Sequence, residues 1–343
     1  MKTYYTFDDV FLIPKFSNCE SRQSLSTDAT IGSLHLKTPI MSSNMDTVTG
    51  PIMAVSMYES GGCGALHRFL SVDKAVRDYE YVLGQRADCF VSIGVNDHEL
   101  YRAQALYNHG ARHFIVDIAH GHSSLMHHTL NILRNTFGDN VYIVAGNVAT
   151  PEAVKDLASW GADCIKVGVG GGSCCSTRVV TGHGVPMFTC LLECCAQADL
   201  CNVKIIADGG IRSSGDMIKS LVAGADMVMI GSLLAGTDEA PGDVIMTPSG
   251  AVKEFRGMAS RPAMEARFGN TKTNLPVDEG VKTVVPLTGS ARRIVSNLTK
   301  GIKSGMSYCN ATSLDELSLH AEWALQSMAG SLEGRPHILT GGR

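Results

Sequence analysis

Two adjacent cysteines lie in a glycine-rich stretch, residues 168–178, that reads GVGGGSCCSTR. Glycine occurs where the backbone must adopt unusual dihedrals or approach a ligand closely. A thiol on such a loop can act as a nucleophile when a positive charge, a helix N-terminus or loop amides favour its thiolate. Arg178 and the loop amides are candidates for this task. The chemistry alone does not choose between Cys174 and Cys175.

Two further glycine-rich loops have the composition of a phosphate site. They read ADGGIRSSG (207–215) and MIGS (229–232), and each follows an apolar run. Backbone amides and helix N-termini after parallel strands are common seats for phosphate groups. We therefore expect a phosphorylated ligand to lie opposite the cysteine loop.

Two other clusters invite a metal interpretation, which we reject. In TCLLECC the spacing of Cys190, Cys194 and Cys195 is not that of a zinc site, and small core residues are the better interpretation. In AHGHSSLMHH (119–128) the four histidines have no known ligand spacing and only Asp117 as a nearby carboxylate. A solvated loop and helix start is expected there.

The bulk composition excludes several classes of protein. The chain has 343 residues, is 44% hydrophobic and carries a net charge of −4, so no basic surface suggests nucleic acid. It contains no apolar run long enough to cross a membrane and no signal-peptide pattern at its start. An odd number of cysteines, 11, then indicates reduced thiols and a cytoplasmic protein.

Eight apolar, β-rich runs recur along the chain. Their continuous hydrophobicity is typical of strands buried on both faces. They span residues 37–43, 63–68, 89–95, 113–119, 141–148, 164–170, 203–210 and 227–232.

The segments between these runs have helix signals, such as Thr150 as an N-cap followed by Pro151, with Gly161 as a stop. The phrases GAR (110–112) and GAD (161–163, 224–226) recur just before strands. Eight βα units predict a single α/β domain over residues 1–343, a (β/α)8 TIM barrel. A doubly wound open sheet is the alternative.

In such a barrel the polar residues that follow the strands share one pocket at the C-terminal face. Residues 236–290 add no further βα unit, and we expect a lid over the barrel mouth at about 250–285. The residues expected at the pocket are Ser42, Ser43, His67, Arg68, Asn96, Asp117, Asn147, the 168–175 loop, residues 208–213, Gly231 and Ser232.

Several motifs of the chain resemble those of the inosine-monophosphate dehydrogenase and GMP reductase superfamily. The resemblance runs from residue 5 to about 310, and it implies a (β/α)8 barrel assembled as a homotetramer. The motifs are YTFDDVFLIP (5–14), SSNMDTVT (42–49), VDIAHGHS (116–123), AGNVAT (145–150), the cysteine loop, IADGGIRSSGD (206–216), MIGSLLAGTDEAPG (229–242), FRGMAS (255–260) and VDEGVKTVVPLTG (277–289).

The resemblance implies roles for individual residues. The family's nucleophile follows G-S-x, which selects Cys175, with Thr177 and Glu279 as its catalytic partners. A monovalent cation, K+, would bind carbonyls of Gly170, Gly172 and Cys175. The expected nucleotide-binding residues are Ser173, Asp208, Gly209, Gly210, Gly231, Ser232, Gly257 and Met258, and the expected cofactor-binding residues are Arg68, Asp117, Ile118 and Ala119.

The resemblance leaves two reactions open. A GMP reductase deaminates GMP to IMP and ammonia with NADPH, whereas a dehydrogenase oxidises IMP to XMP with NAD; both use a covalent thioimidate. Three features favour the reductase: no inserted regulatory domain, a short lid with Arg267-Phe268 in place of Arg-Tyr, and Glu279. VDIAHGHS and SLLAGTDEAPG are more typical of dehydrogenases. A nucleotide-binding barrel without turnover is a third hypothesis.

Overall fold

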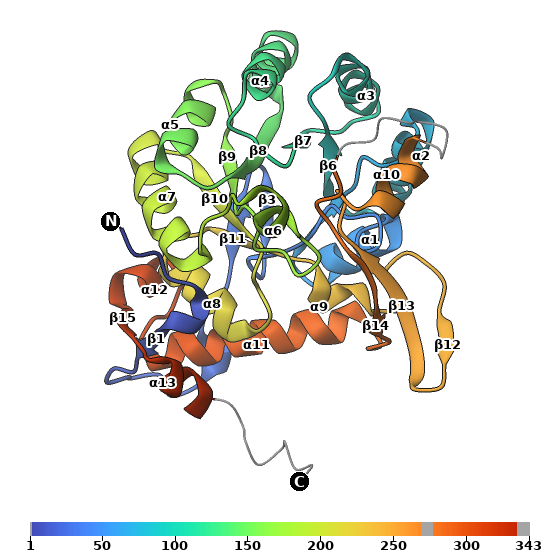
Figure 1. Ribbon diagram of the computed structural model, residues 1–343. Helices are drawn as coiled ribbons and strands as arrows, with labels where there is room; N and C mark the ends of the chain where they lie inside the picture. Colours follow the sequence, from blue (N-terminus) through green and yellow to red (C-terminus); the bar gives the residue numbers. More distant parts are fainter. Residues whose placement is uncertain (1, 269–276, 335–343) are drawn as a thin grey trace.

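The computed structural model describes residues 2–268 and 277–334, and the eight expected strands form a closed parallel barrel in it (Figure 1). The (β/α)8 fold is therefore confirmed. In barrel order the strands are β4 (Ile40–Ser42), β5 (Cys63–Leu66), β6 (Cys89–Ile93), β7 (His113–Asp117), β8 (Tyr142–Val148), β9 (Cys164–Val167), β10 (Lys204–Asp208) and β11 (Met227–Ile230).

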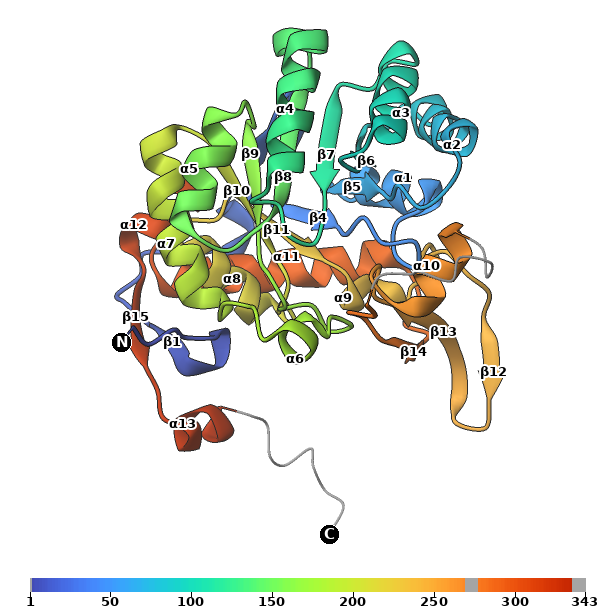
Figure 2. The ribbon, with the colours of Figure 1, turned by 45° about the horizontal axis from the view of Figure 1, so that its top comes forward.

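Helices follow the strands, and the longer ones cover the outside of the barrel, whereas the short helix that starts at Thr177 lies at the C-terminal ends of the strands (Figures 1 and 2). They are α1 (Pro51–Glu59), α2 (Val72–Gly84), α3 (Asp97–Asn108), α4 (Ser124–Phe137), α5 (Pro151–Ser159), α6 (Thr177–Thr181), α7 (Met187–Cys201), α8 (Ser214–Val222), α9 (Ser232–Ala235), α11 (Ala291–Tyr308) and α12 (Leu314–His320), with the 3-10 helix η3 (Gly138–Asn140) after α4.

The recurring GAR and GAD phrases form one repeated turn between a helix and the next strand. Gly110, Gly161 and Gly224 have φ values of 100°, 102° and 103°. A side chain is disfavoured at these dihedrals, so the glycine ends each helix and starts the return to the barrel. At the other end of α5, the hydroxyl of Thr150 accepts from the amide of Ala153, as expected of an N-cap.

The barrel interior is a packed core that is separate from the layer between strands and helices. Every barrel strand contributes an apolar side chain to it, for example Phe90, Ile115 and Met229. A hairpin of β2 (Ala29–Ile31) and β3 (Leu34–Leu36) adds Ile31, Leu34 and Leu36 to the same cluster. The interior is thus filled, and space for a ligand remains only at the mouth.

The expected lid region contains antiparallel strands that the sequence analysis missed. Strand β13 (Gly250–Arg256) pairs with β12 (Ile245–Thr247) on one side and β14 (Lys282–Pro286) on the other. Helix α10 (Arg261–Phe268) lies between β13 and β14 in the chain. The β12–β13 hairpin projects from the barrel on the side away from the N-terminus in Figures 1 and 2. Residues 269–276 of the lid are outside the described part.

The two ends of the described chain meet beside the barrel. Strand β1 (Val10–Ile13) pairs with β15 (Glu322–Leu325), and α13 (Met328–Glu333) follows. The 3-10 helices η1 (Phe7–Asp9) and η2 (Arg22–Ser24) flank β1. Within residues 2–268 and 277–334, no helix has the length and apolarity that crossing a bilayer requires.

Candidate active site

A cavity of about 570 Å³ opens at the C-terminal ends of the barrel strands. Every residue that the sequence analysis assigned to catalysis, nucleotide, cofactor or cation lines it. From the catalytic and cation set these are Gly170, Gly172, Cys175, Thr177 and Glu279; from the nucleotide set Ser173, Asp208, Gly209, Gly210, Gly231, Ser232, Gly257 and Met258; and from the cofactor set Arg68, Asp117, Ile118 and Ala119.

The two neighbouring cysteines are in opposite environments. Cys175 is exposed to the cavity, whereas Cys174 is only 4% exposed. Burial raises the pKa of the Cys174 thiol to about 11. Since the thiolate is the reactive form, the exposed Cys175 is better placed than Cys174 to react with a ligand in the cavity.

Cys175, Thr177 and Glu279 form a hydrogen-bonded chain. The Cys175 thiol donates to the Thr177 hydroxyl over 3.1 Å, and that hydroxyl donates to Glu279 Oε2 over 2.8 Å. A hydroxyl that accepts on one side and donates on the other can pass a proton along the chain. The arrangement can therefore deprotonate the thiol and hold the proton on a carboxyl group for later use.

Backbone pairing brings these residues together although they are about a hundred positions apart. The amide of Ser176 donates to the Glu279 carbonyl over 2.9 Å, and the amide of Val281 donates to the Cys174 carbonyl over 2.9 Å. On the other side of the same segment, the Val281 carbonyl accepts from the Gly257 amide, and the Glu279 amide donates to the Ala259 carbonyl. The cysteine loop, the Glu279 segment and the Gly257–Met258 turn thus form a small sheet across the mouth.

The glycines of the cysteine loop allow close approach to the next loop of the barrel. Gly168 has a φ of 144°, and a Cβ there would lie 1.8 Å from the Asp208 carbonyl oxygen. A Cβ at Gly209 would lie 3.2 Å from backbone atoms of Gly171 and Gly172. The loops after β9 and β10 therefore pack backbone to backbone. This close approach explains why the two cysteines lie among glycines.

Lys166 is a site residue that the sequence analysis missed. Its ammonium group, 3% exposed, lies 2.9 Å from Asp117 Oδ1 and 2.9 Å from Asp208 Oδ2, and it also contacts Asn147 Oδ1. Asn147 Nδ2 in turn donates to Asp208 Oδ2 over 2.9 Å. The available signal was a single lysine inside the apolar run CIKVGVG. A charge at such a position must find a partner inside the barrel.

The charges of this cluster stabilise one another. Burial acts to raise the pKa of Asp117, but Lys166 and Arg68 together with a hydrogen bond from Asn44 outweigh it, and the pKa lies below its usual range. Burial acts to lower the pKa of Lys166, but Asp117 and Asp208 outweigh it and the pKa is raised. Asp117 and Lys166 therefore stay charged at neutral pH, and Lys166 holds the carboxylates of Asp117 and Asp208 at the floor of the cavity.

Removal of this lysine should strongly destabilise the fold. We expect Lys166→Met to lower the free energy of unfolding by about 3–5 kcal/mol, because it leaves two largely buried carboxylates, 19% and 23% exposed, without their counter-charge. Lys204→Met is a matched control, since Lys204 pairs with Asp226 near the surface, where a pair contributes about 0–1 kcal/mol. Urea unfolding measures both. Equal losses in the two variants would contradict this account of Lys166.

Some of the residues expected at the pocket have other positions. Asn96 and Ser213 cap α3 and α8, and Ser42 is buried, where it accepts from the Thr49 hydroxyl. His67 lies with Ser92 in a small separate cavity. These side chains follow strands as expected, but capping and core packing determine where they point.

Arg178, the other candidate for favouring the thiolate, is bonded to the backbone of the cysteine loop. Its Nη2 donates to the carbonyls of Val185 over 2.6 Å and of Val169 over 3.4 Å. The guanidinium therefore ties the ends of the cysteine loop together. The Cys175 thiol itself is bonded to the Thr177 hydroxyl.

His67 should make the stability of the protein sensitive to acid. Burial lowers the pKa of His67 to about 4, whereas an unfolded histidine titrates near 6.5. The unfolded state then binds more protons between these values, so stability is full above about pH 6.5 and falls by up to about 1.4 kcal/mol per pH unit down to pH 4. Urea unfolding from pH 7.5 to 4.5 measures this slope. His67→Asn, which keeps an acceptor for the Phe69 amide, should flatten it; an unchanged slope would contradict the assignment.

The rejected metal clusters have structural explanations. Cys190, Cys194 and Cys195 are buried in α7 as core residues. His122 pairs with Asp156 over 2.8 Å, and the rings of His122 and His127 lie beside Trp160. In the part of the chain that the structure describes, no group of three or more His, Cys, Asp or Glu residues is arranged to hold a metal ion.

The fold and the site together define a (β/α)8 barrel with an exposed thiol in the cavity at its C-terminal face. A model of the IMP dehydrogenase / GMP reductase domain matches residues 4–337. The chain belongs to this family of oxidoreductases.

Relatives under both names resemble it over almost its whole length. The inosine-5'-monophosphate dehydrogenase of Cryptosporidium parvum is 35% identical (97% of this chain, 94% of the relative), and the GMP reductase of Leishmania donovani is 31% identical (98% and 97%). A crystal structure of a GMP reductase from Trypanosoma brucei in complex with guanosine 5'-monophosphate matches with a TM-score of 0.91, 29% identity and 98% coverage of both chains.

Proposed function

We propose that the protein is a GMP reductase, which converts GMP to IMP and ammonia with NADPH. The observation that carries this proposal is the chain of Cys175, Thr177 and Glu279. It places a nucleophile and a carboxyl proton donor on the same side of the cavity. A reaction that must both attack a purine carbon and protonate its amino substituent needs both groups.

The proposed reaction has two steps with balanced atoms and charges. The Cys175 sulfur attacks C2 of the purine, the 2-amino group takes up a proton relayed from Glu279 through Thr177, and ammonia leaves to give a thioimidate. A hydride from NADPH, the second substrate, then adds to C2 and the thiolate leaves as IMP forms. In sum, GMP, NADPH and two protons give IMP, NADP+ and ammonium.

The nucleotide is proposed to lie with its phosphate at the glycine loops. Ser173, Gly209, Gly210, Gly231 and Ser232 would surround the 5'-phosphate, because loop amides suit a dianion. Asp208 would bind the ribose hydroxyls, while Gly257 and Met258 would meet the purine. The complex of GMP with the Trypanosoma brucei reductase supports a nucleotide in this fold.

Polar groups at the cofactor side of the cavity fit a bound ligand. Arg68 lines the cavity, and its buried Nε has no hydrogen-bond partner among the residues described. Unpaired buried donors are costly, so a polar ligand that satisfies them would bind favourably. We assign the nicotinamide half of NADPH to this side, near Arg68, Asp117, Ile118 and Ala119.

The cation site and the assembly also remain proposals. Gly170, Gly172 and Cys175 lie on one turn of the loop, where the Cys175 amide donates to the Gly172 carbonyl over 3.0 Å. A carbonyl oxygen has a second lone pair, so these residues fit a K+ ion. In that case K+ would hold the loop around Cys175. We further propose the homotetramer that the family resemblance implies.

IMP dehydrogenase is the second candidate, because relatives with that name are as similar as the reductases. The lack of an inserted domain does not distinguish a GMP reductase from an IMP dehydrogenase. The alignment with the Leishmania donovani reductase spans 476 positions, compared with 343 residues in this chain. The Arg267-Phe268 pair remains an argument from sequence, since these side chains lie outside the described part. Phenylalanine has no hydroxyl with which to activate water.

Absorbance at 340 nm with the purified protein separates the candidates. With GMP and NADPH we expect the signal to fall, and with IMP and NAD we expect no gain. A gain with IMP and NAD would establish the dehydrogenase instead. A protein that binds GMP but changes neither signal would be a nucleotide-binding barrel without turnover.

A further inference from the structure

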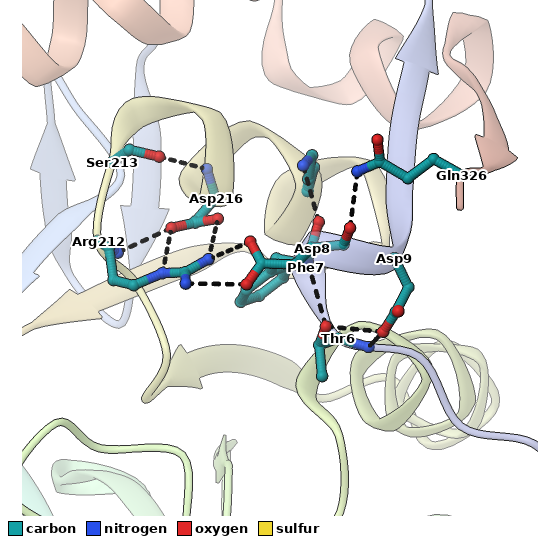
Figure 3. A network of polar contacts seen from close by, with 9 residues as sticks. Thr6, Phe7, Asp8, Asp9, Arg212, Ser213, Asp216 and Gln326 are labelled. Carbon is teal, nitrogen blue, oxygen red and sulfur yellow. Dashed lines mark hydrogen bonds and ion pairs between the residues drawn. The ribbon is translucent and has the colours of Figure 1, made fainter. Parts of the chain in front are cut away.

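The loop after β10 faces the cavity on one side and the N-terminal segment on the other. Arg212 belongs to the residues that line the cavity. Its guanidinium nevertheless extends to Asp8, with Nη1–Oδ2 at 3.0 Å and Nη2–Oδ1 at 2.6 Å (Figure 3). Two parallel bonds of this kind fix the geometry of an arginine–carboxylate pair more tightly than a single bond.

A second carboxylate fixes the same arginine from the barrel side. Asp216, which is 4% exposed, accepts from the Arg212 amide over 2.9 Å and from Arg212 Nε over 3.3 Å. Asp216 lies in the first turn of α8, where its amide donates to the hydroxyl of the N-cap Ser213. Asp216 thus anchors the loop to α8, while Asp8 anchors it to a different part of the chain.

The segment that carries Asp8 is itself held in place. Thr6 and Asp9 form a capping box around η1. Lys219 Nζ donates to the Phe7 carbonyl over 2.8 Å, and Gln326 Nε2 donates to the Asp8 carbonyl over 2.7 Å (Figure 3). The pairing of β1 with β15 continues this unit, so Asp8 presents its carboxylate from a rigid support.

The loop after β10 needs support from other elements because it contains two consecutive glycines. Gly209 and Gly210 have φ values of 107° and 75°, and neither has a side chain that could anchor the backbone. The buried ring of Phe7 lies next to this point, 3.7 Å from where a Cβ of Gly210 would stand. The orientation of the loop amides therefore depends on Arg212 and its two carboxylates.

We propose that Asp8 is a positioning residue of the nucleotide site, which acts through Arg212 on the phosphate loop at Gly209–Gly210. The proposal rests on the proposed function insofar as it takes this loop as the phosphate seat. Asp8 does not touch the nucleotide; it sets the direction of the amides that do. Its loss should therefore weaken binding of the phosphate and leave the chemistry at Cys175 intact.

The test compares nucleotide and nucleoside binding by calorimetry. For Asp8→Asn we expect the Kd for GMP to rise about threefold to fivefold, since a half-exposed pair contributes at most about that much. The Kd for guanosine should not change. Asp8→Glu should restore part of the affinity. The matched control is Glu59→Gln, which breaks the half-exposed pair between Glu59 and Arg292 that joins α1 to α11; it should not change either Kd.

Kinetics and hydrogen exchange add readouts that a purely structural role would not produce. In Asp8→Asn the KM for the nucleotide should rise by the same factor with kcat unchanged, and amides of the 209–213 loop should exchange faster. Unchanged GMP affinity, or tighter binding because the freed Arg212 reaches the phosphate itself, would overturn the proposal. An equal effect on GMP and guanosine would also overturn it.

The same experiment separates this proposal from the proposed function. IMP and inosine are measured in parallel, so the ratio of nucleotide to nucleoside affinity is obtained whichever reaction the enzyme performs. If the wild type binds neither nucleotide better than its nucleoside, the phosphate seat is misplaced. If the wild type prefers nucleotides and Asp8→Asn keeps the full preference, the positioning role of Asp8 is wrong.

Discussion

Replacing Cys175 by alanine should abolish turnover, with a loss on the order of 10³-fold or more, whereas Cys174→Ala should keep most of the activity. Covalent catalysis has no substitute once the thiol is gone. Cys175 is exposed in the cavity and bonded to Thr177, while Cys174 is buried with a raised pKa. Steady-state rates of NADPH oxidation with GMP measure both variants.

Measurements of GMP binding and of protein stability are the controls for the two cysteine variants. Both variants should bind GMP with nearly the wild-type Kd, because neither side chain belongs to the proposed phosphate seat. Cys174→Ala creates a small cavity and should cost some stability, which urea unfolding reports separately. If both variants fold and bind GMP but lose activity equally, the assignment of Cys175 rather than Cys174 as the nucleophile is wrong.

Glu279→Gln should slow deamination of GMP by roughly 10²–10⁴-fold, the usual contribution of a positioned general acid. The amide keeps the shape of the side chain and can still bond with the Thr177 hydroxyl, but it cannot donate the proton that the leaving amine needs. Hydride transfer requires no such donor. The reverse hydride step, from IMP to the oxidised cofactor, should therefore be much less affected.

A pre-steady-state measurement of both steps on one variant tests this selectivity. Asp278→Asn is the matched control: it neutralises the neighbouring exposed carboxylate, which accepts from the amide of Gly280, and it should leave both steps nearly unchanged. Deamination at the wild-type rate in Glu279→Gln would show that Glu279 is not the acid. An equal slowing of both steps would mean that it positions the loop instead.

The barrel could be predicted from the sequence because each element carried its own local signal. The runs were predominantly apolar, and Thr150, Pro151 and Gly161 mark the ends of α5 as capping rules require. Cys175, Thr177 and Glu279 were named from the family's motifs, and the structure brings them within hydrogen-bond distance. Their separation of about a hundred residues left no local signal of the contact.

What sequence reasoning missed depends on tertiary pairing. In the sequence, Lys166 is a single charge within an apolar strand. The structure shows that Asp117 and Asp208 lie beside it as partners. The strands of the lid contain a buried charge, Lys253, whose ammonium bonds to the carbonyls of Thr237 and Ala240, so the alternation typical of a strand is broken. Asn96 followed a strand as expected, yet its local capping bond with the Glu99 amide decided its direction.

The ratio of ammonia released to NADPH oxidised, with GMP as substrate, tests the central claim most directly. Reductive deamination through Cys175 requires one ammonia for each NADPH, and the wild type should give this ratio while IMP accumulates in the same amount. Cys175→Ala should release no ammonia above background. Formation of XMP and NADH from IMP, with no ammonia from GMP, would contradict the account.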